Sequence, residues 1–191
     1  MSSRDILNLL VRPAIFSLCN ALEISGTAAF MDRGTVNIIK NKLKELKPPG
    51  ERASCLAALQ RNPQGHPDDA RGLLTKEDDP VKHFAECGLM YKTATPNFPL
   101  VDAIFFFVKS PRKTMVGLQM TTAGQHHTTA STVRQFTEYL SWFFKNWGEF
   151  SLDLSWEIIY LQPIDSKPIN KWQRCDVVNS GSREEKELRR Y

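Results

Sequence analysis

Long hydrophobic runs are missing from this 191-residue chain, and their absence excludes a membrane-spanning helix. The longest apolar stretch, residues 6–18, is interrupted by Arg12 and Pro13, whereas a bilayer span needs about 20 predominantly apolar residues. The start of the chain contains Asp5 and no apolar run that ends in a small-residue cleavage site, so we expect no secretory signal peptide. These absences predict an intracellular protein that makes no membrane contact.

Two motifs that bind cofactors are also missing. The four cysteines, at positions 19, 55, 87 and 175, are too far apart to form a Cys-x-x-Cys metal pair, and we expect them to be free thiols. No Gly-x-x-x-x-Gly-Lys-Ser/Thr sequence occurs, so the chain has no P-loop and no nucleotide site of that type. We therefore expect no cofactor.

The first 47 residues are predicted to form an α-helical segment. A helix is expected over residues 5–23, with a break at Pro13 and a connection at 25–27, where Ser, Gly and Thr follow one another. A second helix is expected over 33–47, because apolar residues recur there at three- and four-residue steps before Pro48 ends the pattern. Asp32 or Thr35 is positioned to cap its start.

Lysines occupy the opposite face of this second helix and account for most of the net charge of +4. Lys40, Lys44 and Lys47 are candidate contacts to a nucleic-acid backbone, because lysines neutralise phosphates. Any solvated amphipathic helix shows the same pattern, however, so the lysine face is open to both interpretations.

A change of composition marks the remaining boundaries. Residues 48–80 hold five prolines and three glycines and are predicted to be a linker with one helical turn. Residues 81–180 are predicted to be an α/β domain, with strands at 89–95, 100–108, 114–122 and 154–161 and a helix at 132–147 that begins with a capping box at Thr132 and Gln135. Residues 181–191 are predicted to be a charged helix that is cut short, as in a truncated copy.

Asp102 lies among apolar residues in the second of these strands. A buried carboxylate needs a partner, because without one its charge costs several kcal/mol. The turn to the next strand is short, so the two strands are expected to be antiparallel neighbours with Asp102 facing Gln119. Thr121 shares the face of Gln119. This pattern suits a functional site, and it equally suits an aspartate that binds loop amides at the start of a strand.

Several long strings in the chain resemble the retrotransposon hot spot (RHS) proteins of trypanosomes, over nearly the whole length except residues 68–97. The strings are CNALEISGTAA at 19–29, LKPPGERA at 46–53, FPLVDAIFFF at 98–107, VGLQMTTAGQHHTTASTVRQFTEYL at 116–140, SWEIIY at 155–160 and WQRCDVVN at 172–179. The resemblance implies the C-terminal portion of a larger architecture. In that architecture a P-loop ATPase region accompanies a domain resembling restriction endonucleases, as in Crinkler-type proteins.

The implied fold is an α/β restriction-endonuclease-like core of helix, three strands, helix and strand, preceded by an α-helical segment. Metal-dependent members carry an Asp on the second strand and Glu/Gln-x-Lys on the third. Asp102 matches the Asp and Gln119 the Glu/Gln, and the two would hold Mg²⁺. Thr121 stands in place of the lysine, and a hydroxyl carries no positive charge for the transition state. No spacing argument brings Lys113 or the pair His126 and His127 to the site in its place.

Arg134 lies in the first turn of the helix expected after the third strand and is a candidate phosphate contact, although such residues are more often solvated. The reading favoured by these observations is a non-catalytic, nuclease-like RHS-family protein that acts through nucleic-acid or chromatin-associated contacts. Nuclear localisation follows from the resemblance alone. The alternative is a divergent Mg²⁺-dependent nuclease that uses Asp102 and Gln119, and a second alternative is a structural remnant that binds only other proteins.

Overall fold

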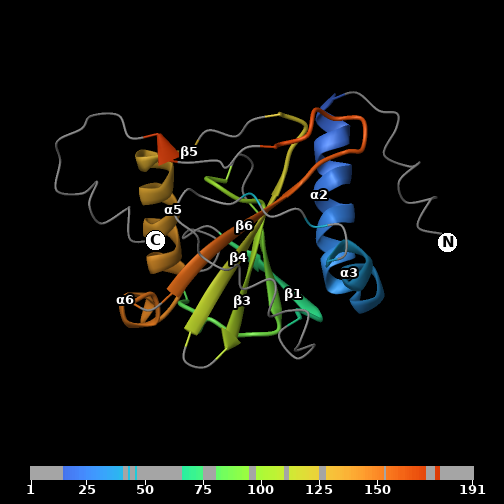
Figure 1. The fold of residues 1–191 in the computed structure, drawn as a ribbon. Helices are drawn as coiled ribbons and strands as arrows, with labels where there is room; N and C mark the ends of the chain where they lie inside the picture. The colour runs from blue at the N-terminus through green and yellow to red at the C-terminus, as the bar shows by residue number, and fades with distance from the viewer. Residues whose placement is uncertain are drawn as a thin grey trace.

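The computed structural model shows a mixed α/β protein in which a five-stranded sheet lies between helices (Figure 1). The structure describes residues 15–40, 43, 46, 66–74, 81–94, 98–109, 112–124, 128–152, 154–170 and 175–176. The expected helix at 181–191 and most of the region 41–65 therefore lie outside the described residues. None of the helices within this part of the chain is long and apolar enough to cross a membrane.

Helix α2 spans Ile15–Met31 and α3 spans Arg33–Lys40. The connection expected at 25–27 is wrong, because α2 continues through these residues. Thr27 is buried, and its hydroxyl donates to the carbonyl of Glu23 at 2.8 Å, which satisfies it inside the helix. Gly26 packs against Met120, where an added Cβ would come within 3.0 Å of the Met120 side chain. The cap expected at Asp32 is confirmed, since Asp32 Oδ1 accepts the Thr35 N–H at 2.7 Å.

The sheet has the strand order β1-β2-β3-β4-β6. Strands β2 (Leu89–Thr93), β3 (Ala103–Lys109) and β4 (Arg112–Met120) are consecutive antiparallel neighbours. Strand β6 (Leu154–Leu161) pairs in parallel with β4 and has the bounds that the sequence predicts. Helix α5 (Ala130–Phe143) connects β4 to β6, as the parallel pairing requires.

Strand β1 (Asp69–Leu73) falls inside the range predicted to be a linker, so that range is in part a strand of the sheet. It pairs in parallel with β2 at the sheet edge. Only Leu73 is buried in β1, and the sequence DARGL lacks the β-branched residues of a typical strand. Pairing with β2, rather than local propensity, therefore determines this strand.

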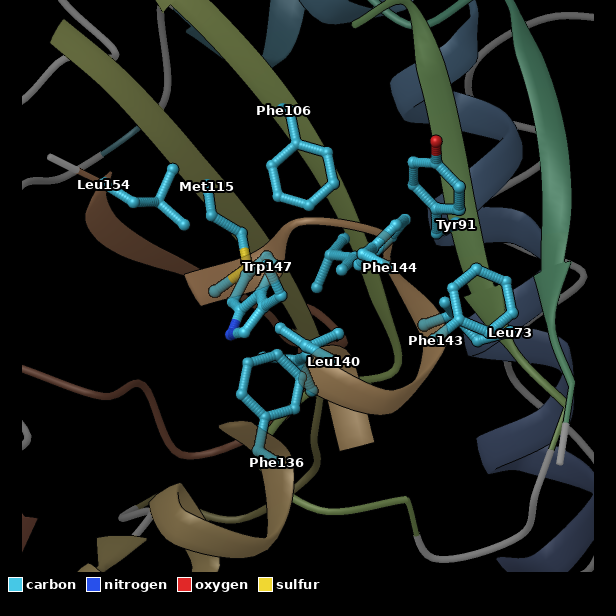
Figure 2. Close-up of a cluster of buried hydrophobic side chains, with 12 residues drawn as sticks. Leu73, Tyr91, Phe106, Met115, Phe136, Leu140, Phe143, Phe144, Trp147 and Leu154 are labelled. Atoms are coloured by element: carbon cyan, nitrogen blue, oxygen red, sulfur yellow. The ribbon is translucent and has the colours of Figure 1, made fainter. Parts of the chain in front are cut away.

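Two apolar clusters hold the layers together. On one face of the sheet, Val116, Leu118 and Met120 of β4 pack with Leu22 and Phe30 of α2. The other face meets α5 and the short helix α6 (Trp147–Phe150) through aromatic side chains, which pack largely edge to face (Figure 2). Phe106 and Phe144, for example, have ring centroids 5.4 Å apart at 78°. Helices α2 and α5 therefore cover opposite faces of the sheet (Figure 1).

The helix predicted at 132–147 differs at both ends. Its N-cap is Thr129, whose hydroxyl accepts the Thr132 N–H, so the capping box expected at Thr132 is wrong. The helix ends at Phe143 because Phe144 is extended and bridges to His83, and Asn146 is left-handed with φ 55° before α6 begins. The two-residue strands β5 (Thr128–Thr129) and β7 (Cys175–Asp176) form a separate small ladder.

Candidate functional site

Asp102 lies immediately before β3, not inside a strand as predicted. Its backbone is held from both sides of the sheet. The Asp102 N–H donates to the carbonyl of Leu118 on β4 at 2.8 Å. Its carbonyl accepts both the N–H and the hydroxyl of Thr93, at 3.1 and 3.0 Å. The position of this aspartate is thus fixed by β2 and β4 together.

The Asp102 carboxylate faces Gln119, as the antiparallel register predicts. Its Oδ2 accepts the Gln119 Nε2–H at 3.2 Å and the backbone N–H of Met120 at 2.6 Å. The Met120 N–H points toward β3 just where the β3–β4 ladder ends, so the carboxylate replaces a backbone acceptor. This contact is the one expected of an aspartate that binds a loop amide at a strand start.

A tight turn delivers Asp102 to this position. Leu100 has a φ of 76°, and the Val101 N–H donates to the carbonyl of Pro99 at 3.0 Å. An i to i+2 bond around a central residue with positive φ is a γ-turn of the rare, strained kind. The side chain of Leu100 packs against the aromatic cluster, which stabilises the turn.

Glu23 on α2 is a site residue that the sequence reasoning missed. Burial and the nearby negative charge of Asp102 both raise the pKa of Glu23. The pKa of Asp102 is also raised, by burial, against the opposing effect of its hydrogen bond from Met120. Glu23 is the only charged residue in α2, which is a usable signal. The pattern of α2 alone does not show which strand end it meets.

Thr121 lies one residue beyond β4, where its side chain is used locally. It is 8% exposed, and its hydroxyl accepts the Ala123 N–H at 3.0 Å. The Thr121 N–H donates to the Leu161 carbonyl at 2.9 Å. The threonine therefore supports the loop after β4 and supplies no positive charge to Asp102.

Lys113 does not take the place of the expected lysine. Its ammonium donates to the Phe150 carbonyl at 3.4 Å and lies 4.8 Å from the centre of the Phe150 ring. Lys113 is also six positions before Gln119 on β4, a distance of about 20 Å along a strand. His126 and His127 lie outside the described residues.

The predicted nucleic-acid contacts are not brought to this site. Arg134 is exposed on α5, whereas Glu23 approaches Asp102 from α2 on the other side of the sheet. The side chains of Lys40, Lys44 and Lys47 lie outside the described residues. A role of these four residues in binding nucleic acid stays a prediction.

The donor set does not fit a magnesium ion. One Asp102 oxygen is already engaged by Met120 and by the amide nitrogen of Gln119, and that nitrogen is a hydrogen-bond donor, not a metal ligand. In the described part of the chain, no group of three or more His, Cys, Asp or Glu side chains is placed to hold a metal ion. The assignment of Asp102 and Gln119 as metal ligands stays a prediction.

Comparison with protein-family models, with curated proteins and with solved structures gives no match to this chain. The class of the protein therefore rests on its own geometry, which is a mixed five-stranded sheet between helices. The site at the end of β4 is a buried polar contact between Asp102, Gln119 and Met120 with Glu23 beside it.

Proposed function

We propose that this chain is a nuclease-like domain of the RHS type that does not cleave nucleic acid and acts through nucleic-acid or chromatin-associated contacts in the nucleus. The long strings at 98–107 and 116–140 that resemble RHS proteins support the family and the nuclear placement. They cover β3, β4 and most of α5, which are the elements around the candidate site.

The order of elements supports a restriction-endonuclease-like core. Helix α2 precedes three antiparallel strands, β2, β3 and β4, and helix α5 then leads to β6, which is parallel to β4. This is the sequence of helix, three strands, helix and strand of that fold. Asp102 and Gln119 occupy the matching ends of the second and third core strands.

The observation that carries the non-catalytic reading is the use of the Asp102 carboxylate. Its Oδ2 is bonded to the Met120 backbone at 2.6 Å, and the residue in the lysine position, Thr121, is bonded to Ala123. A metal-dependent nuclease needs its carboxylates free for the ion and a cation for the anionic transition state. The groups at this site instead stabilise the end of the β3–β4 hairpin.

One observation favours the alternative, a divergent Mg²⁺-dependent nuclease that uses Asp102 and Gln119. Glu23 brings a second carboxylate close enough to raise its pKa through the charge of Asp102. Two carboxylates of raised pKa are typical of a site that accepts a cation or a proton. The alternative therefore requires Glu23 as well as Asp102.

Cleavage assays distinguish these readings. The wild type, Asp102→Asn, Glu23→Gln and Thr121→Lys are incubated with single- and double-stranded DNA and RNA in Mg²⁺ or Mn²⁺. Asn keeps an oxygen acceptor for the Met120 N–H, so loss of activity in Asp102→Asn would not reflect loss of folding. We expect no cleavage by the wild type. Wild-type cleavage that both carboxylate variants abolish would establish the nuclease instead.

Thr121→Lys tests the fold assignment in the same experiment. If Thr121→Lys gains metal-dependent cleavage while the wild type is silent, the domain is a nuclease fold that lost its lysine. The third reading, a remnant that binds only proteins, predicts no salt-dependent binding to nucleic acid. A binding constant that falls with increasing salt supports nucleic-acid contact, because bound phosphates release counterions.

A further inference from the structure

Strand β6 is a long edge strand of the sheet. It spans the eight residues Leu154–Leu161, and within the described structure β4 is its one strand neighbour (Figure 1). The main-chain groups on its other side are therefore available for pairing with a further strand.

The direction of each main-chain group in β6 follows from one hydrogen bond. The Leu161 carbonyl accepts from Thr121 on the β4 side, at 2.9 Å. N–H and C=O groups alternate between the two sides of a strand, so those of Trp156, Ile158 and Tyr160 point away from β4. No described residue bonds to the outward main-chain groups of Trp156 and Ile158.

The sequence of β6 lacks the usual protection of an edge strand. The string LSWEIIYL contains no proline, lysine or glycine, and Glu157 is its one charged residue. Edge strands usually avoid pairing by such residues or by a bulge. Here the strand pairs with β4 without interruption from Leu154 to Leu161.

We propose that β6 pairs with β6 of a second copy of this chain in an antiparallel manner, centred on Ile158, so that the sheet continues across a two-fold dimer. In this register Trp156 and Tyr160 face each other, and all three outward residues form hydrogen-bonded pairs. Glu157 then lies opposite Ile159 of the second copy. A twofold register centred on Glu157 places two carboxylates opposite each other, which is destabilising.

A second copy suits this edge better than an unrelated strand for a reason of charge and symmetry. The single carboxylate of β6 meets an apolar residue in the Ile158-centred register, so no charge is left opposite a like charge. The pairing is closed, because each copy uses the same strand and leaves no further free edge at β6.

Cross-linking tests this dimer. In the Ile158-centred register the two Cα atoms of residue 158 are about 5.5 Å apart, within the range of about 4.4–6.8 Å that a disulfide spans. Ile158→Cys is therefore expected to form a disulfide-linked dimer on mild oxidation. Tyr160→Cys is the matched control, since its two copies are about 13 Å apart along the strands, and the wild type controls for the native cysteines.

The molar mass of the wild type over a concentration series, measured by light scattering after size exclusion, needs no variant to fold. We expect a concentration-dependent shift to twice the chain mass, together with a cross-link specific to Ile158→Cys. A monomer at every concentration overturns the proposal and leaves the edge to a strand of another protein. A dimer in which Ile158→Cys links no better than Tyr160→Cys overturns it too, because that dimer uses another surface.

Discussion

The carboxylate of Asp102 accepts the backbone N–H of Met120 at 2.6 Å, across the end of the β3–β4 hairpin. Met120 is the last residue of β4 and is 8% exposed, so its N–H has little access to water. A buried N–H without an acceptor is costly. The residue that looks most catalytic in the sequence therefore has a structural task, which the wild-type fold needs whether or not the site binds a metal ion.

Replacing Asp102 by alanine is expected to destabilise the protein by about 1–3 kcal/mol, because it leaves the Met120 N–H unsatisfied. Asp102→Asn is expected to retain most of the stability, since the amide oxygen can accept the same hydrogen bond. Urea unfolding followed by circular dichroism measures both, with equal m-values showing that the denatured state is unchanged. If the two variants lose the same stability, the Met120 contact is not what the carboxylate contributes.

The pair of carboxylates predicts a dependence of stability on pH. Burial raises the pKa of both Glu23 and Asp102 in the folded state, and the charge of Asp102 adds to the rise at Glu23. The folded state thus holds protons that the unfolded chain releases above about pH 4. The contribution of this pair to stability is therefore full below that pH and is lost as the pH rises through the folded-state pKa values.

Glu23→Gln is expected to reduce this loss, because it removes one titrating group and the repulsion of Asp102. The measurement is the free energy of unfolding of the wild type and the variant from pH 4 to pH 7. Glu138→Gln, a substitution of an exposed glutamate on α5, is the matched control and is expected to follow the wild type. Identical pH curves for Glu23→Gln and the wild type would contradict the proximity of the two carboxylates.

Apolar periodicity predicts the elements that are buried. The bounds of β6 agree with the prediction because its residues are apolar and its neighbours form turns. The N-terminus of α5 is misplaced by three residues because Thr129 and Thr132 are both good caps, and only the fold decides between them. Strand β1 is not predictable from DARGL, because its partner β2 is the reason that it exists.

The candidate site shows the same limit. The antiparallel register alone predicts that Asp102 faces Gln119, and the structure shows that contact. Neither the γ-turn at Leu100 nor the approach of Glu23 is visible in the sequence, because both depend on how distant elements pack. The backbone partner of Asp102, Met120, is likewise a property of where the hairpin ends.

Gly117 provides a test of how β4 packs beside this site. A Cβ added to Gly117 would lie 2.6 Å from Cγ1 of Val101, which is buried. Gly117→Ala is therefore expected to destabilise the protein by about 1–3 kcal/mol through overpacking. Gly148→Ala, where nothing lies within 4 Å of the added Cβ, is the control and is expected to leave stability nearly unchanged.

The double variant Gly117→Ala with Val101→Ala shows whether the clash is the cause. Removing the Val101 methyl groups makes room for the new Cβ, so the double variant is expected to lose less stability than the sum of the two single variants. Chemical denaturation of all four proteins gives the coupling energy, which should favour the double variant by about 0.5–3 kcal/mol, the usual range for residues in contact. Additive effects would mean that Val101 does not fill the space beside Gly117, and the path of the chain from Leu100 to Asp102 would have to be redrawn.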